Sequence, residues 1–141
     1  MQHLLLLHGA IGGKDQLQPL AELLNSNFIV HTLSFSGHAG NDIPDEPFSI
    51  ELFANDVIQY LDQQKIEQVN IFGYSMGGYV ALYLAHRNPT ILGNIITLGT
   101  KFEWSPEIAQ KEVKMLNSKA IIEKVPKFAE ALQKRHGKDW E

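Results

Sequence analysis

Short aliphatic runs alternate with longer helical patterns along the first hundred residues of the chain. Four runs are candidates for β-strands: His3–His8, Phe28–Leu33, Val69–Gly73 and Ile95–Leu98. The first reads HLLLLH, and an apolar run that is continuous rather than alternating is typical of a strand buried on both faces. The pattern therefore predicts an α/β fold, with a parallel sheet of about four strands and helices on both faces in three layers.

Three helical patterns lie between these strands. We expect helices over Asp15–Asn25, Ser49–Gln64 and Met76–Arg87. Asp15 and Ser49 are suited to cap the first two, because their side chains can accept hydrogen bonds from free main-chain N–H groups. The third helix should end at Asn88, because the following Pro89 disfavours helical backbone at the residue before it.

Composition changes near residue 100. Residues 1–100 hold ten of the eleven glycines and three basic residues, whereas residues 101–141 hold one glycine and nine basic residues. The later part is charged and amphipathic, with a helix start at Ser105-Pro106 and a helix end at Gly137. We therefore expect two units, a core at 1–100 and a helical lid or cap segment at 101–141.

Length, charge and cysteine content exclude several classes of protein. The 141 residues suffice for one hydrophobic core, and the absence of cysteine excludes a disulfide scaffold, a thiolate zinc site and a cysteine nucleophile. A net charge of −4 argues against nucleic acid or an anionic membrane as partner. No apolar run is long enough for a signal-peptide core or a membrane span. We expect a cytoplasmic protein that uses no cofactor or metal.

The segment Gly73-Tyr74-Ser75-Met76-Gly77 has the G-x-S-x-G pattern. It lies where an expected strand ends and an expected helix begins, which is the setting of a nucleophile elbow. Such a turn strains the serine backbone and projects its hydroxyl from the sheet, and glycines avoid collisions with neighbouring backbone. The pattern indicates Ser75 as a catalytic nucleophile, and the alternative is a serine in an ordinary glycine-rich turn.

A second segment, His8-Gly9-Ala10, follows the first expected strand. Acyl-transfer chemistry needs two main-chain N–H donors that converge on one oxygen, called an oxyanion hole. We expect the donors to be Ala10 and Met76, the latter being the residue after the nucleophile. In this interpretation His8 shapes the loop and is not the catalytic base, and the alternative is a purely structural histidine.

Three segments together resemble the α/β-hydrolase family, in their order and spacing as well as in their residues. His8-Gly9-Ala10 resembles the oxyanion-loop motif, Gly73–Gly77 the nucleophile elbow, and Ser36-Gly37-His38-Ala39-Gly40 a Pro-Gly-His-Gly-x segment of that family. Ser34, Ser36 and Ala39 depart from the family pattern within a structural loop. The resemblance covers residues 1 to about 100, and the last 40 residues look like the start of a helical lid. It implies attack by Ser75 on a small ester, thioester or amide.

The resemblance also implies a triad in the chain order serine, acid, histidine, which this sequence lacks. His86 lies eleven residues beyond Ser75 on the same expected helix, about 16 Å along its axis. His136 precedes Asp139, which is the wrong order, and we interpret this tail as a solvated helix end. Glu103 is interpreted as a surface residue. We favour an N-terminal fragment of a longer hydrolase over a natural short relative, and expect the chain alone to be nearly inactive.

Three alternatives remain open at the level of sequence. The same fold could serve a non-catalytic binding or scaffold protein, or a lyase or acyltransferase of the same family. The glycine-rich segments after residues 8 and 73 also resemble small members that act in menaquinone synthesis.

The outer edge of the fourth strand and the apolar faces of the last helices lack their usual partners in the family, which predicts a homodimer. The apolar residues of those helices are Ile108, Met115, Leu116, Ile121, Ile122, Val125, Phe128 and Leu132.

Overall fold

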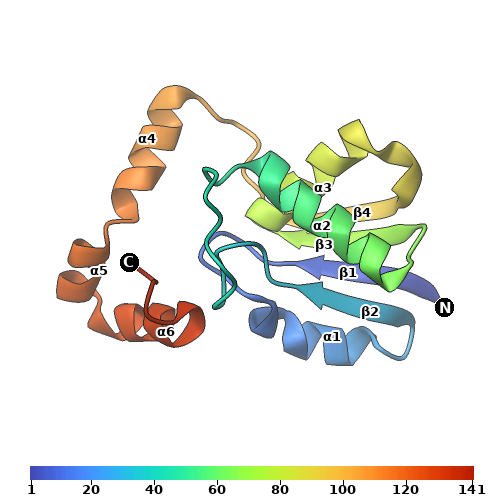
Figure 1. Ribbon diagram of the computed structural model, residues 1–141, viewed down its shortest axis with the longest axis horizontal. Helices are drawn as coiled ribbons and strands as arrows, with labels where there is room; N and C mark the ends of the chain where they lie inside the picture. The colour runs from blue at the N-terminus through green and yellow to red at the C-terminus, as the bar shows by residue number, and fades with distance from the viewer.

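A computed structural model describes all residues, 1–141, and contains one parallel sheet of four strands. The strands are β1 (Gln2–Leu7), β2 (Phe28–Leu33), β3 (Val69–Tyr74) and β4 (Leu92–Leu98), in the spatial order β2-β1-β3-β4. All three neighbouring pairs are parallel, so the carboxyl ends of the four strands meet at one edge of the sheet (Figure 1). The predicted fold class is confirmed.

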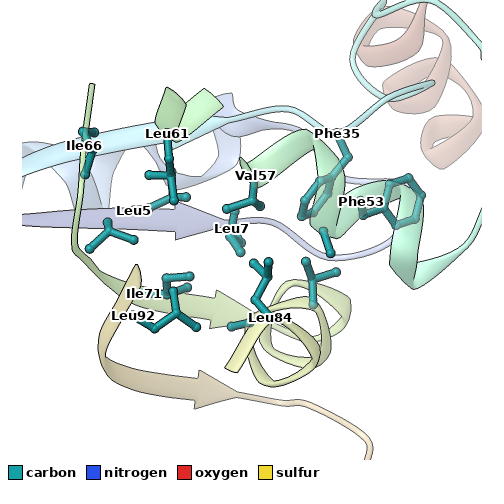
Figure 2. Close-up of a cluster of buried hydrophobic side chains, with 14 of the residues drawn as sticks. Leu5, Leu7, Phe35, Phe53, Val57, Leu61, Ile66, Ile71, Leu84 and Leu92 are labelled. Atoms are coloured by element: carbon teal, nitrogen blue, oxygen red, sulfur yellow. The ribbon is translucent and has the colours of Figure 1, made fainter. Parts of the chain in front are cut away.

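The leucine run of β1 supplies both faces of the sheet. Leu4 and Leu6 pack against α1 (Gln18–Leu24), while Leu5 and Leu7 point to the opposite face. On that face α2 (Ile50–Gln64) and α3 (Met76–Arg87) close the main core, seen in Figure 2. Because side chains alternate along a strand, a continuous apolar run is what two covered faces require.

Two expected boundaries were wrong. Residues Lys14–Leu17 form a short 3₁₀ helix, and α1 begins only at Gln18. Asp15 is therefore not a helix cap: a helix begun there would place Pro19 in its interior, where proline offers no N–H for the Asp15 carbonyl. Ser49, in contrast, caps α2 by accepting a hydrogen bond of 3.0 Å from the Leu52 N–H.

The strand β4 begins three residues earlier than expected, at Leu92. Its first residues include Gly93 and Asn94, which have no strand pattern, and its pairing with β3 shifts register between Val69 and Ile71. The Asn70 side chain accepts a hydrogen bond of 2.8 Å from the Asn94 N–H at this irregularity. The Asn70 side chain thus takes the place of a main-chain partner for Asn94. The sequence pattern of β4 gives no sign of this contact.

Three tail helices lie beyond the carboxyl ends of the strands (Figure 1). They are α4 (Pro106–Met115), α5 (Ser118–Lys124) and α6 (Pro126–His136). Ser105 caps α4 as expected, and Gly137 ends α6 with a positive φ of 81°. Ile121 of α5 and two residues of α6 form a small apolar cluster of their own. None of the helices in the chain combines the length and apolar character needed to cross a membrane.

Candidate active site

Ser75 occupies the sharp turn between β3 and α3. Its backbone has φ 50° and ψ −117°, which is a strained conformation for a residue with a side chain. The Ser75 N–H donates to the Leu98 carbonyl at 2.8 Å, and the Ser75 carbonyl accepts from the Thr100 hydroxyl at 2.8 Å. The turn is thereby held to the end of β4, and the half-buried Ser75 hydroxyl makes no hydrogen bond within the protein.

The two flanking glycines of the turn are required by close backbone approach. A Cβ atom added to Gly73 would lie 2.4 Å from the Cα atom of Gly78, and one added to Gly77 would lie 2.5 Å from the Leu7 carbonyl oxygen. Both distances are far inside van der Waals contact, and neither neighbour is a flexible side chain. The G-x-S-x-G spacing therefore follows from how β3, α3 and β1 pack at this point.

The loop after β1, residues 8–13, is named the oxyanion loop for the donor that its sequence is expected to supply at Ala10. Leu7 pairs with Gly73, so this loop and the Ser75 turn emerge side by side from neighbouring strands. A Cβ added to Gly9 would lie 3.2 Å from the Ser75 Cβ. Ala10 is exposed, and its N–H has no acceptor in the protein.

Met76 is the first residue of α3, where a helix leaves N–H groups without an intrahelical acceptor. The positive end of the helix dipole lies at the same place and favours negative charge there. The structure thus brings Ser75, Ala10 and Met76 together at one edge of the sheet.

The buried ring of His8 fixes the oxyanion loop through hydrogen bonds. Its Nε2 accepts the Phe35 N–H at 3.1 Å, so the proton lies on Nδ1, which donates to the Gly9 carbonyl at 2.7 Å. The side chain is only 1% exposed, and this burial lowers the pKa of His8 to about 4. Both ring nitrogens are engaged and the ring is neutral at pH 7, so His8 shapes the loop and has no free nitrogen for Ser75.

The loop after β2, residues 36–40, is fixed by one carboxylate of α2. Asp56 accepts hydrogen bonds from both the N–H and the hydroxyl of Ser36, each at 2.7 Å. His38 donates from Nδ1 to the Ser36 carbonyl at 3.0 Å, and burial lowers the pKa of His38. Ala39, which stands where the family often has glycine, adopts a left-handed φ of 52°.

The interpretation of His136 as part of a solvated helix end was wrong. His136 is half-buried; its Nδ1 accepts the Ala39 N–H at 2.8 Å, and its Nε2 donates to the Ile11 carbonyl at 2.8 Å. Arg135 donates to the same Ile11 carbonyl at 2.9 Å. These contacts join residues 97 to 125 positions apart, so no local pattern could have indicated them.

No second triad member stands beside Ser75 in the structure. His86 lies exposed in the last turn of α3, and its side chain makes no hydrogen bond. Glu103 and Asp139 are exposed and form neither hydrogen bonds nor ion pairs. The arrangement holds a serine and two main-chain donors without a paired base and acid.

Other kinds of site are not evident around the chain. No three His, Asp or Glu side chains gather in a way that could hold a metal ion. Two hollows of about 160 and 280 Å³ lie near the carboxyl end of β2, and both are lined by Ser34, Asn41 and Tyr60. Ser75 lines neither hollow, so both hollows are separate from the turn that holds Ser75.

Comparison with known proteins agrees with the fold and with the motifs. The family described as alpha/beta hydrolase fold matches residues 2–130 of the chain. This protein therefore belongs to the α/β-hydrolase family.

Several relatives carry names of acyl-transfer and hydrolytic enzymes. A probable alcohol acetyltransferase of Wickerhamomyces anomalus is 25% identical over 97% of this chain and 39% of its own length. A putative carbamate hydrolase, RutD, of Rhizobium rhizogenes is 27% identical over 72% of this chain and 38% of its own length. The chain thus spans less than half the length of these curated relatives.

A crystal structure of a hydrolase from Pseudomonas aeruginosa PA01 superposes with a TM-score of 0.78. The match covers 99% of this chain and 60% of that chain, at 18% identity. At this identity the likeness shows the fold alone, and it extends over the tail helices as well as the sheet.

Proposed function

We propose that this chain carries the nucleophile and the oxyanion hole of a serine hydrolase that acts on a small ester, thioester or amide. The observation that carries the proposal is the strained backbone of Ser75, with φ 50° at the strand-to-helix turn. Strain of this size persists only where the surrounding structure enforces it, and it clusters at active sites. The names of the hydrolytic relatives support the same class of reaction.

In the proposed reaction the Ser75 Oγ attacks the acyl carbonyl carbon, and the hydroxyl proton passes to a base. The carbonyl oxygen becomes an oxyanion that accepts hydrogen bonds from the N–H groups of Ala10 and Met76. The intermediate collapses to an acyl-serine as the leaving alcohol, thiol or amine takes up a proton. Water then adds to the acyl-serine and releases the carboxylic acid and the free Ser75 hydroxyl.

The base and its orienting acid are not among the residues beside Ser75. We propose that they belong to sequence beyond these 141 residues, and that residues 101–141 begin a lid over the site. Loss of a triad member lowers the rate by several orders of magnitude, while the oxyanion hole and binding leave some residual catalysis. The chain alone is therefore expected to turn over activated esters very slowly.

Labelling with a fluorophosphonate, which phosphonylates activated serines, tests the proposal. Intact mass and peptide mapping should find a single adduct on Ser75, absent from Ser75→Ala and retained in the control Ser26→Ala, which changes an exposed serine. Failure to label Ser75, both in this chain and in a longer chain that supplies the base, would favour the alternative of a scaffold protein. Turnover of p-nitrophenyl acetate at the rate of a complete triad, abolished in Ser75→Ala, would contradict the expected inactivity.

The acetyltransferase relative favours a second candidate in which an alcohol replaces water as the acyl acceptor. The first half of the reaction is unchanged, and the acyl-serine is then attacked by the alcohol oxygen to give an ester. Slow turnover of p-nitrophenyl acetate in the presence of ethanol separates the candidates. Ethyl acetate as the main product supports transfer, and acetate supports hydrolysis.

A further inference from the structure

Two neighbouring residues at the end of α6 donate hydrogen bonds to the same main-chain oxygen. Arg135 Nη1 lies 2.9 Å and His136 Nε2 lies 2.8 Å from the carbonyl oxygen of Ile11. Ile11 belongs to the oxyanion loop and directly follows Ala10. We propose that Arg135 and His136 are positioning residues for the oxyanion loop, an inference that rests on the function proposed above for Ala10.

Two peptide groups and one hydrogen bond between them transmit the position of the Ile11 carbonyl to Ala10. The Ile11 carbonyl and the Gly12 N–H belong to one planar peptide group, and the Gly12 N–H donates to the Gly9 carbonyl at 3.1 Å. The Gly9 carbonyl and the Ala10 N–H belong to another planar group and point in opposite directions. Holding the Ile11 carbonyl from α6 therefore helps to fix the direction of the Ala10 N–H.

The His136 ring joins the oxyanion loop to the loop after β2. It accepts the Ala39 N–H at Nδ1 and donates to Ile11 from Nε2. Only the neutral ring with its proton on Nε2 can make both hydrogen bonds. The neighbouring ring of His38, with its centroid 5.9 Å away, comes from the same loop as Ala39.

The residues held in this way are both strained. Ile11 has φ 55° and Ala39 has φ 52°, in the left-handed region that disfavours side chains and β-branched ones most of all. Strain of this kind needs outside contacts to persist. The Ile11 side chain supplies a further contact, because it packs against the apolar cluster of Ile121, Ala129 and Leu132 in the tail helices.

Amide substitutions separate the two hydrogen bonds of the His136 ring. His136→Gln can place a donor near the former Nε2 and keep the Ile11 bond, while His136→Asn can place an acceptor near the former Nδ1 and keep the Ala39 bond. Arg135→Met removes the other donor to Ile11 and keeps an apolar stem. Lys134→Ala, an exposed neighbour on α6, is the matched control.

The first readout is the rate of Ser75 labelling by a fluorophosphonate in the 141-residue chain. Misplaced main-chain donors should slow labelling about tenfold or more in His136→Asn and Arg135→Met, with His136→Gln and Lys134→Ala near the original rate. The second readout is the set of amide NMR shifts of Ala10, Ile11 and Gly12, which should move in the slowed variants only. If α6 had a purely structural role, the labelling rate of each variant would instead follow its thermal stability.

The outcomes separate this inference from the proposed function. Unchanged labelling and unchanged amide shifts in His136→Asn and Arg135→Met would overturn the inference while the function stands. Absence of labelling in the unaltered chain and in a longer chain that supplies the base, with amide shifts that still move in these variants, would overturn the function and leave the positioning contact established. Equal slowing in His136→Gln and His136→Asn would also count against the inference, because it would show a general loss of packing.

Discussion

The hydroxyl of Thr100 donates a hydrogen bond to the main-chain carbonyl of Ser75, with 2.8 Å between the two oxygens. The Ser75 N–H donates to Leu98, two residues before Thr100. Both main-chain groups of the strained residue are thus tied to the end of β4. The turn depends on a neighbouring strand as well as on its own glycines.

Replacing Thr100 by valine, which has nearly the same shape, removes this hydrogen bond. The Ser75 carbonyl keeps the Gly78 N–H at 3.1 Å, so no carbonyl is left unpaired, and the expected loss is about 1 kcal/mol in the free energy of unfolding. Urea unfolding measures this loss, and fluorophosphonate labelling of Ser75 should slow in parallel. Thr100→Ser keeps the hydroxyl and is the control; equal labelling rates in both variants would contradict the role given to Thr100.

Gly77→Ala should disrupt the junction of α3 and β1. Its Cβ would lie 2.5 Å from the Leu7 carbonyl oxygen, so the helix must move away from the sheet, at an expected cost of about 3 kcal/mol or more. Gly40→Ala is the matched control, because its Cβ would meet nothing within 4 Å and only the backbone strain at φ 82° is added. Thermal unfolding compares the two, and similar losses would contradict the steric explanation.

Stability should fall with acid between about pH 6.5 and pH 4 because of His8. The folded ring stays neutral down to a pKa of about 4, whereas the unfolded ring takes up a proton near 6.5. The unfolded state therefore binds more protons in this range, which costs about 3 kcal/mol of stability once the pH has fallen through the folded pKa. His38, whose pKa burial also lowers, acts in the same direction.

Urea unfolding from pH 7 to pH 4 measures this slope. His8→Asn should flatten it, and His86→Ala, which removes an exposed histidine, should leave it unchanged. A stability independent of pH in the unaltered chain would show that the ring is not held neutral by burial.

We propose that the chain forms a homodimer through the edge of β4 or through the tail helices. On β4, Ile96 is 63% and Leu98 is 56% exposed beside an unpaired strand edge, and on α4 Met115 is 62% exposed. Sedimentation velocity over a range of concentrations should show a dimer. Ile96→Lys should abolish it if the sheet edges meet, and Met115→Lys if the helices meet; a monomer at every concentration would contradict the proposal.

Local patterns were sufficient to predict most of the sheet. The continuous leucine run of β1 has both faces covered, as its pattern indicates, and Ser49 and Ser105 cap the helices that follow them. The start of β4 was missed because Asn70, on another strand, completes its pairing. The start of α1 differs from the prediction because a helix begun at Asp15 would need the N–H that Pro19 lacks.

Local sequence patterns likewise predict one part of the candidate site and miss another. Ser75 and its two flanking glycines lie within five residues, so a contiguous motif predicts their geometry. The contacts that hold this motif and the oxyanion loop come from Thr100 and His136, 25 and 125 residues away from their partners. In these contacts a side-chain hydroxyl and an imidazole donate hydrogen bonds to main-chain carbonyls. Sequence spacing does not indicate contacts of that kind.

The contact between α6 and Ile11 also sets an order of assembly during synthesis. His136 is made 125 residues after Ile11 of the oxyanion loop. Proteins fold as they emerge, with the N-terminal part first, and contacts of such long sequence separation form slowly. The oxyanion loop is thus made before the Ser75 turn but takes its final shape after it, and a nascent chain that already has the Ser75 turn would still lack a fixed Ala10.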